Sequence, residues 1–478
     1  MSMGTREDGK QPSIWVEACE VARGEGHVFY RRLNELLRRH GFDAFVEKRV
    51  SESRVFADGV GRPSIPPGTY LRMMFAGFFE GLPSERAIAW RCADSFSLRE
   101  FLGFGLTEAT PDHSTLSGLR RRLPETLHRE VFDWVLKVAA EEGLLKGRKV
   151  AIDATTLEAN AAMRTIVRIA DGASYQKYLK KLARAEGIKD PTPQDLGRMD
   201  RKRKGKKVSN TDWKSPSDPD ARITKMKDGT THLAHKAEHA VDLDSGVIVA
   251  AEIHPADSGD TATLPQTLDR AEAAVERANS GFSIEEIVAD CGYHSAQTLG
   301  DLDRQGYMTC IPERRSKGRR RWKRLAHELG PEEARRRQQA FYQNRRRLKS
   351  PVGKRLLGKR GETVERSFAH VCETGAMRRL HLRGRENISK RYQVHVGAAN
   401  IGIILRKLIG MGTPRGFQGR KSLLRALFHL LLSPLRFSLG FLRGQFAIPR
   451  DVSRFHPQTL LASLLTTLNP NAGLSTAC

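Results

Sequence analysis

Two aspartates follow short apolar runs that are typical of β-strands. The stretch KVAIDATTLEA places Asp153 near the end of the first run. The stretch IEEIVADCGY places Asp290 directly after the second run, just before a turn at Gly292. A strand that ends on a carboxylate delivers it to the edge of a sheet. If the two strands are neighbours, both acids reach the same edge, and close carboxylates repel each other unless a cation lies between them.

Glu365 is the candidate for a third carboxylate. The stretch ETVERSFAHVCETG predicts a helix in which Val364, Phe368 and Cys372 form one apolar stripe, with Glu365 at its edge. Oxygen ligands favour Mg²⁺ or Mn²⁺. Two such ions roughly 4 Å apart can activate a nucleophile and stabilise a leaving oxygen at phosphorus. Each acid alone has an ordinary explanation, a turn cap or a solvated helix face, so the hypothesis depends on their meeting.

The charge of the chain indicates a polyanionic partner. The 478 residues carry a formal net charge of +26, for which nucleic acid is the best explanation. Ribosome-associated and membrane-surface proteins are alternatives with similar charge. Residues 314–349 alone contain 15 Lys and Arg against 3 Glu, with aromatic residues interleaved, and this basic segment is the best candidate for contact with a DNA backbone.

The patterning divides the chain into a helical part and a mixed part. Residues 1–140 show apolar residues at helical spacing throughout. From residue 149 onward the order is strand, loop, hairpin, helix, strand, helix, strand, which predicts an α/β (α+β) mixed sheet flanked by helices. Residues 170–230 are expected to be loop-rich and to lack a core. The apolar stretch 423–442 is interrupted by Arg and Pro and is not expected to span a membrane.

Cysteine and histidine patterns give little support to a structural metal. The six cysteines are scattered without a CxxC pair, which favours reduced thiols. On a strand, His235 and His239 share a face and His232 does not, so a zinc site is not expected. The first residues lack an apolar signal segment.

In their order along the chain, these motifs resemble a DDE transposase of a bacterial insertion sequence. The resemblance covers roughly residues 15–418. It is carried by PPGTYLRMMFAGFFEGLPSERAI, TPDHSTLSGLRRRL, AIDATTLEAN, SPSDPDARITKMKDGTTHLAHKAEHAVDLDSG, VADCGYHS and VERSFAHVCETGAMRRLHLRGREN. Each motif is weak alone, but the ordered set is specific.

The resemblance implies a fold and a set of site residues. It implies an RNase H-like core over residues 145–418, with the basic segment around 314–349 as an insertion, and a helical N-terminal domain over 1–140 that binds the DNA ends. Residues 419–478, which the resemblance does not cover, are expected to form an apolar and basic C-terminal tail. Asp153, Asp290 and Glu365 match the metal-binding triad. The family's Tyr and Lys positions around the Glu are not matched, so Glu373 and Glu386 remain rivals for the third acid.

Further residues are expected to contact DNA because they are basic or aromatic and close to the expected site or within the basic segment. For Tyr293 and His294, which follow Asp290, ordinary turn packing is the equally weighted alternative. The expected DNA-binding residues are Arg222, Lys225, Lys236, Tyr293, His294, Arg319, Arg320, Arg321 and Arg366.

The expected activity is metal-dependent DNA strand cleavage and strand transfer. Two other activities remain as alternatives. One is a non-catalytic DNA-binding regulator descended from a transposase, and the other is an RNase H-like nuclease without strand transfer. The expected cofactor is a pair of Mg²⁺ or Mn²⁺ ions. The expected partners are the element ends and target DNA, with a homodimer in the DNA complex, no membrane and no small-molecule cofactor. We expect a cytoplasmic protein associated with the nucleoid.

Overall fold

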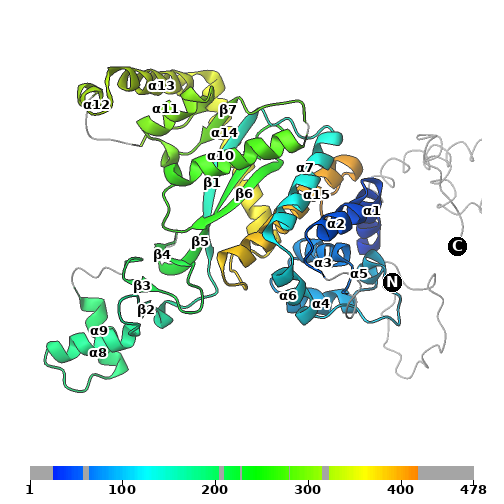
Figure 1. The fold of residues 1–478 in the computed structure, drawn as a ribbon, viewed down its shortest axis with the longest axis horizontal. Helices are drawn as coiled ribbons and strands as arrows, with labels where there is room; N and C mark the ends of the chain where they lie inside the picture. Colours follow the sequence, from blue (N-terminus) through cyan, green and yellow to red (C-terminus); the bar gives the residue numbers. More distant parts are fainter. Residues whose placement is uncertain are drawn as a thin grey trace, which may run out of the picture. The chain divides into compact units, whose positions relative to one another are not determined.

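The computed structural model describes residues 25–56, 64–203, 209–226, 229–278, 280–314 and 322–417. Residues His27–Pro414 form one compact unit, which contains all the strands of the described chain (Figure 1). No helix in the described ranges is long and apolar enough to cross a membrane. The stretch 423–442 and the tail 419–478 lie outside the described residues.

The N-terminal part of this unit is helical, as its sequence predicts. Gly41 separates the first two helices with a φ of +67°, a conformation that glycine adopts without strain. Asp112 caps the sixth helix by accepting a hydrogen bond from the backbone N–H of Thr115 at 2.8 Å. The helices are α1 (Glu25–Arg39), α2 (Phe42–Glu52), α3 (Pro67–Glu80), α4 (Glu85–Asp94), α5 (Phe96–Leu102), α6 (His113–Arg122) and α7 (Glu125–Glu141).

A six-stranded mixed sheet follows and confirms the predicted fold class. Its central strand β1 pairs antiparallel with β5 on one side and parallel with β7 on the other. The outer edge of β5 is shared by β4 and β6, and β8 pairs parallel with β7. Gly246, with a φ of +78°, closes the predicted hairpin between β5 and β6. The strands are β1 (Lys149–Glu158), β4 (Arg222–Lys225), β5 (Thr231–Asp242), β6 (Ile248–Pro255), β7 (Glu286–Ala289) and β8 (Met308–Cys310).

Helices cover both faces of this sheet. Helix α10 (Asp260–Arg277) packs on β5 and β6, and α14 (Pro351–Phe368) crosses the other face over β7, β1 and β5. Helix α15 (Arg385–Ile409) packs on β6 and also on α7 and α3. The segments on either side of the boundary expected at residues 140–145 are therefore packed together through α15.

The segment between β1 and β4 differs from the expectation of a loop-rich stretch without a core. We call residues 159–221 the insertion. It contains α8 (Tyr175–Ala185), α9 (Pro193–Lys202) and the paired strands β2 (Val167–Arg168) and β3 (Trp213–Lys214). Trp213 meets Tyr175 and Tyr178 edge-on, with ring centroids 5.1 and 5.3 Å apart. Trp213 follows the two tyrosines by about 35 positions, so no local pattern in the sequence predicted this core.

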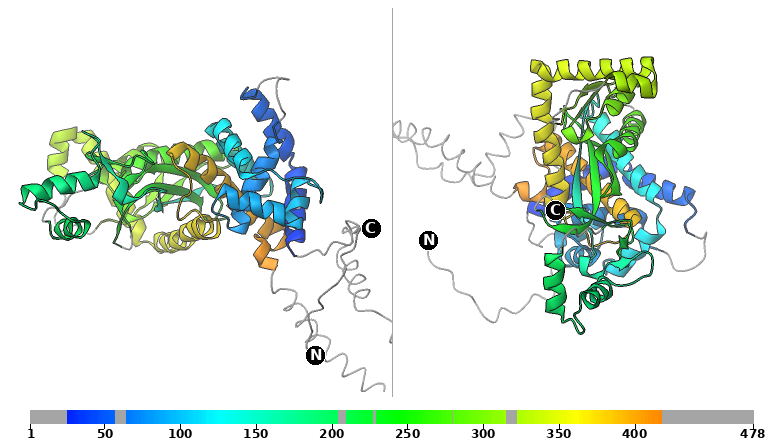
Figure 2. Two further views of the ribbon diagram at one scale, coloured as in Figure 1. Left: turned by 90° about the horizontal axis from the view of Figure 1, so that it is seen from below. Right: turned by 90° about the vertical axis from the view of Figure 1, so that its left-hand side faces the viewer.

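The basic segment after β8 is also helical in its described part. Helix α11 (Ala296–Arg304) precedes it, and it forms α12 (Trp322–Leu329) and α13 (Pro331–Lys349). Several of its arginines are already paired with glutamates of the chain: Arg337 with Glu333 at 2.7 Å, Arg345 with Glu313 at 2.6 Å and Arg347 with Glu286 at 2.9 Å. Figure 1 and the right-hand view of Figure 2 place α12 and α13 at the opposite end of the sheet from α8 and α9.

Candidate active site

Asp153 and Asp290 lie on neighbouring parallel strands at adjacent positions. The register of β1 and β7 sets Ile152 opposite Ala289, so the next residue of each chain segment is an aspartate. Strand β7 ends at Ala289, as predicted for Asp290. Asp153 was expected near the end of its strand but lies in the middle of β1, which continues to Glu158. The two carboxylates therefore meet where β7 stops and β1 continues alone beside β5.

Arg360 from α14 is the cation next to this pair. Its Nη1 lies 2.9 Å from Asp153 Oδ2, while Asp153 Oδ1 accepts a hydrogen bond from the backbone N–H of Ala154 at 2.8 Å. Burial raises the pKa of Asp153, and the charge of Asp290 acts in the same direction, against the opposing effects of Ala154 and Arg360. The raised pKa shows that burial and the neighbouring acid together outweigh the stabilisation that Ala154 and Arg360 give to the Asp153 anion.

The turn after Asp290 is shaped by a glycine. Asp290 Oδ1 accepts a hydrogen bond from Gly292 N at 2.7 Å and caps the short helix Cys291–Tyr293. A Cβ atom at position 292 would lie 2.2 Å from Oδ2 of Asp260 and 2.8 Å from Oδ1 of Asp290. Glycine thus lets a further carboxylate, at the start of α10, approach the turn that carries Asp290.

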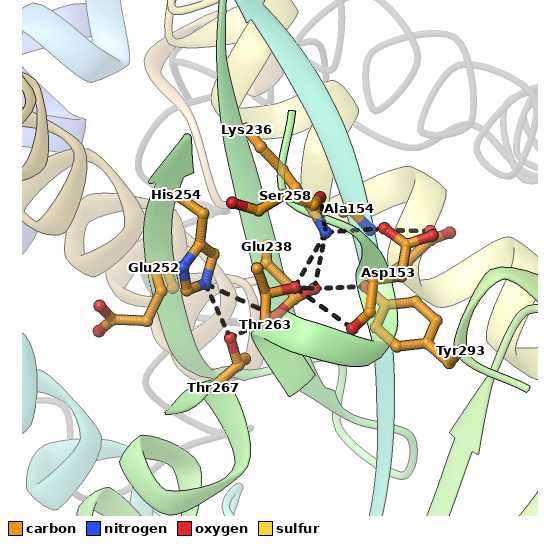
Figure 3. A network of polar contacts seen from close by, with 12 residues as sticks. Asp153, Ala154, Lys236, Glu238, Glu252, His254, Ser258, Thr263, Thr267 and Tyr293 are labelled. Atoms are coloured by element: carbon orange, nitrogen blue, oxygen red, sulfur yellow. Dashed lines mark hydrogen bonds and ion pairs between the residues drawn. The ribbon is translucent and has the colours of Figure 1, made fainter. Parts of the chain in front are cut away.

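A buried glutamate anchors this turn to the sheet. Glu238 on β5 is fully buried, and its Oε1 accepts hydrogen bonds from the Tyr293 hydroxyl at 2.6 Å and from Thr263 Oγ1 at 2.8 Å. Its Oε2 accepts a hydrogen bond from Thr267 (Figure 3). Burial raises the pKa of Tyr293 well above its usual value, as does the negative charge of Glu238, so the phenol stays protonated and donates.

Lys236 provides the positive charge of this buried cluster. Its Nζ lies 2.7 Å from Asp260 Oδ1, 2.9 Å from Thr263 Oγ1 and 3.5 Å from Glu238 Oε1. Figure 3 shows Lys236, Glu238, Thr263 and Tyr293 converging close to Asp153. The lysine therefore balances acids that support the Asp290 turn.

The third carboxylate is not gathered with the other two in this structure. No group of three or more His, Cys, Asp or Glu side chains within the described residues is arranged to hold a metal ion. Glu365 lies on α14, one residue after the buried Val364 and about 7 Å along the helix axis from Arg360. The opposite flank of α14 faces the β5–β6 turn, where Lys359 pairs with Asp244 at 3.0 Å. Glu365 is thus on the flank toward Asp290, with an exposed carboxylate.

The rival acids are engaged elsewhere. Glu373 pairs with Arg378 at 2.8 Å, and Glu386 pairs with Lys390 at 2.6 Å. The Glu365 side chain makes no ion pair or hydrogen bond with any described residue. Of the three glutamates, it alone has no ion-pair partner among the described residues.

The residues that were expected to contact DNA differ in how exposed their side chains are. Tyr293, His294 and Lys236 are 0%, 7% and 5% exposed, so direct contact with DNA does not fit them in this structure, and they support the turn and the buried cluster instead. Lys225 is exposed on β4, and Arg222 is half-buried beside it. Arg366 is exposed but pairs with Glu362. Residues Arg319, Arg320 and Arg321 lie outside the described residues.

Two of the three clustered histidines have hydrogen-bond partners within the protein. His235 Nε2 lies 3.0 Å from Asp218 Oδ2. His239 Nε2 lies 2.8 Å from the Tyr392 hydroxyl, and its Nδ1 lies 2.9 Å from Ser367 Oγ, which itself donates to a backbone carbonyl. His239 is therefore neutral with the proton on Nδ1, consistent with burial lowering its pKa to about 3.

Sequence reasoning missed Asp260 and the central position of Glu238. A signal for Glu238 was present, because Lys236 and Glu238 alternate on an otherwise buried strand and must share a face. Asp260 had no comparable signal, since an acid at a helix start is ordinary. Its proximity to Gly292 arises only when α10 packs beside the short helix Cys291–Tyr293 that follows β7.

The fold combines a mixed sheet, paired aspartates where a parallel strand ends, and a helical N-terminal region. This combination defines the RNase H-like class of DNA-processing proteins. Residues 145–401 match the family model described as Transposase DDE domain, and residues 18–122 match the model described as Transposase domain (DUF772). The chain belongs to the DDE transposase family of insertion elements. No curated protein and no solved structure matches it.

Proposed function

We propose that this transposase cleaves DNA strands in a metal-dependent reaction and joins the resulting ends to target DNA. The observation that carries the proposal is the register of β1 and β7, which sets Asp153 and Asp290 at adjacent positions on neighbouring strands. Asp153, Asp290 and Glu365 are the proposed catalytic residues. No Ser or Tyr nucleophile is needed, because water and then a DNA 3′-hydroxyl can attack phosphorus directly.

The residues present fit a divalent cation. The family generally uses divalent metal. The raised pKa of Asp153 reflects burial beside a second carboxylate, which is the electrostatic situation that a divalent cation relieves. Asp153 and Asp290 offer hard oxygen donors, which Mg²⁺ and Mn²⁺ prefer. Asp153 and Asp290 would hold the metal, with Glu365 supplying a third carboxylate from the flank of α14. The ions, when bound, would lower the pKa of an attacking water and stabilise the leaving oxygen.

The chain's own side chains define the rest of the site. The Glu238 and Tyr293 pair holds the Asp290 turn against β5. Arg360 neutralises part of the acid pair before a substrate arrives. The net charge of +26 attracts the phosphate backbone to this edge.

The direct test uses Asp290→Asn and Asp153→Asn in the full chain. The substrate is a plasmid that carries the DNA flanking the coding region on both sides. We expect each variant to bind this DNA and to lose strand cleavage in Mg²⁺ by at least about 1,000-fold, the scale of losing a main electrostatic contribution. The control is Asp269→Asn, which alters an exposed aspartate of α10. Retained cleavage in Asp290→Asn would contradict the assignment.

A second assay separates transposition from simple nucleolysis. Pre-cut ends with free 3′-hydroxyls are incubated with a target plasmid, and covalent joining is measured. Joining by the unmodified protein supports a transposase, while cleavage without joining supports the nuclease alternative. Binding without any metal-dependent nicking supports the regulator alternative.

A further inference from the structure

The insertion between β1 and β4 carries an exposed cationic surface that the site described above does not use. On α8, the basic residues recur at i, i+3, i+4 and i+7, which places them on one face of the helix. They are Lys177, Lys180, Lys181 and Arg184, all exposed. On α9, three more basic residues recur at i, i+3 and i+4. They are Arg198, Arg201 and Lys202, also exposed.

The opposite face of each helix is apolar and packed. Leu179 and Ala183 of α8 bury against Leu196 of α9, with Leu182 and Met199 beside them. Tyr175 and Tyr178 extend this contact to the cluster around Trp213 (two further residues of this cluster, Ile223 and Leu233, belong to β4 and β5). The insertion is therefore fixed to the edge of the main sheet, and its cationic faces are held outward.

These cations are not held in ion pairs, although the charge of Arg198 acts on Asp195 in the first turn of α9. None of the seven exposed residues forms an ion pair with a described residue. The one ion pair between described residues of α9 and its cap is Arg203 with Asp200 at 3.3 Å, on the packed side near the Tyr175 and Tyr178 hydroxyls. This contrasts with α13, where Arg337, Arg345 and Arg347 are paired with glutamates. A charged face without internal partners is what a polyanion requires.

The position of the insertion relates it to the acid pair. The part of strand β1 that follows Asp153 ends at Glu158, and the insertion begins at Ala159. Five strand residues span about 17 Å, which corresponds to roughly five base pairs of duplex at 3.4 Å each. The basic residues of α8 extend over about 10 Å of helix axis. A duplex held at the acid pair and running along β1 toward Glu158 would extend toward the end of the sheet at which α8 and α9 lie (Figure 1).

We propose that the cationic faces of α8 and α9 form a docking surface for the phosphate backbone of DNA on one side of the catalytic acids. The inference rests on the proposed function and adds a second contact region to it. The contact is with phosphates, because lysines and arginines on a regular helix face offer charge without a fixed base-reading geometry. The occupant is duplex DNA rather than a second protein copy, since α8 and α9 carry seven exposed cations against two acids, Asp195 and Asp200, so two such faces would repel each other.

The test measures how DNA binding depends on salt. The full chain carrying Asp290→Asn is titrated against a fluorescent 40-base-pair duplex of arbitrary sequence in EDTA, over a range of KCl concentrations. The test variant adds Lys177→Ala, Lys180→Ala, Lys181→Ala and Arg184→Ala. The slope of log K against log [KCl] is negative, and each lost phosphate contact reduces its magnitude by about 0.9. We expect the magnitude of the slope to fall by about 3 to 4 in the quadruple variant.

Controls separate a local contact from a general loss of charge. The matched variant removes four exposed cations outside the insertion that likewise form no ion pair with a described residue: Arg31→Ala, Arg38→Ala, Lys146→Ala and Lys354→Ala. A neutral variant, Gln176→Ala, reports on helix α8 itself. Replacing the three lysines of α8 by arginine should preserve the slope. Circular dichroism and thermal unfolding check that each variant is folded.

The outcomes are distinct. A slope change below about 1 in the α8 variant, or an equal change in the matched variant, overturns the inference. Loss of self-association by light scattering, with an unchanged slope, assigns the face to another protein copy and overturns it as well. Cleavage assays with Asp290 intact distinguish failure of this inference from failure of the proposed function. Absence of cleavage in the unmodified protein contradicts the proposed function. The salt dependence of DNA binding can still be interpreted in that case.

Discussion

The Tyr293 hydroxyl donates a 2.6 Å hydrogen bond to the fully buried carboxylate of Glu238, joining the turn that carries Asp290 to strand β5. Asp290 itself contacts Gly292 within that turn. The position of one proposed catalytic acid, Asp290, therefore depends on the side chain of Tyr293, three residues away, and on its partner Glu238, which is 55 residues from Tyr293 in the sequence. This relationship makes Tyr293 a positioning residue rather than a DNA ligand.

Tyr293→Phe tests this positioning role. Removing a donor to a buried carboxylate should cost about 2 kcal/mol of stability and lower the cleavage rate, while DNA binding is kept. The matched control is Tyr30→Phe, which removes a similar 2.8 Å bond from a buried tyrosine to Glu80 in the helical region. Urea unfolding should show similar losses for both variants. Equal cleavage rates in the two variants would mean that the Tyr293 bond is only structural.

Arg360 should compete with metal for Asp153, since its Nη1 lies 2.9 Å from Asp153 Oδ2. In Arg360→Ala the acid pair loses its resident cation, so the metal-free protein should melt at a lower temperature and Mg²⁺ should raise that temperature more than in the unmodified protein. Thermal unfolding across a Mg²⁺ titration measures both effects. Lys359→Ala, which removes a pair with Asp244 on the other flank of α14, should show neither. A smaller Mg²⁺ response in Arg360→Ala would show that the arginine supports the metal site.

The third acid can be identified by three single substitutions. Glu365→Gln should abolish cleavage in Mg²⁺ with little change in stability, because its carboxylate is exposed and has no ion pair with a described residue. Glu373→Gln and Glu386→Gln should keep cleavage, because these acids pair with Arg378 and Lys390. Rates are compared with unfolding midpoints for all three. Loss of cleavage confined to Glu373→Gln would move the third position there.

Acid should destabilise the fold through its buried histidines. Burial lowers the pKa of His239 to about 3 and that of His128 to about 4, below the unfolded value of about 6.5. The unfolded chain then binds more protons than the folded chain between those values, so stability is full above pH 6.5 and falls as the pH drops toward 4. At pH 5 each histidine should remove about 2 kcal/mol relative to pH 7.

Urea unfolding at pH 7 and pH 5 measures this loss. The double substitution His128→Gln and His239→Gln should flatten the pH dependence, although it lowers stability at both pH values. A pH dependence that is unchanged in the double variant would exclude these two histidines as its source.

The sequence by itself determined the local structure and which acids are candidates for the site. Strand and helix periodicity, the turn at Gly246 and the end of β7 before Asp290 are set by neighbouring residues, so they could be predicted without coordinates. The family motifs also depend on short stretches in a fixed order. For the same reason the all-helical N-terminal part and the mixed sheet were predicted correctly.

Only the tertiary structure decided which distant side chains meet. The pairing of Arg360 with Asp153 spans 207 positions, and the bond between Tyr293 and Glu238 joins separate elements. The core of the insertion likewise depends on Trp213 reaching two tyrosines that precede it by more than 30 residues. Such contacts follow from how helices and strands pack in three dimensions, because burial and ion pairing depend on distance in space and not on distance along the chain.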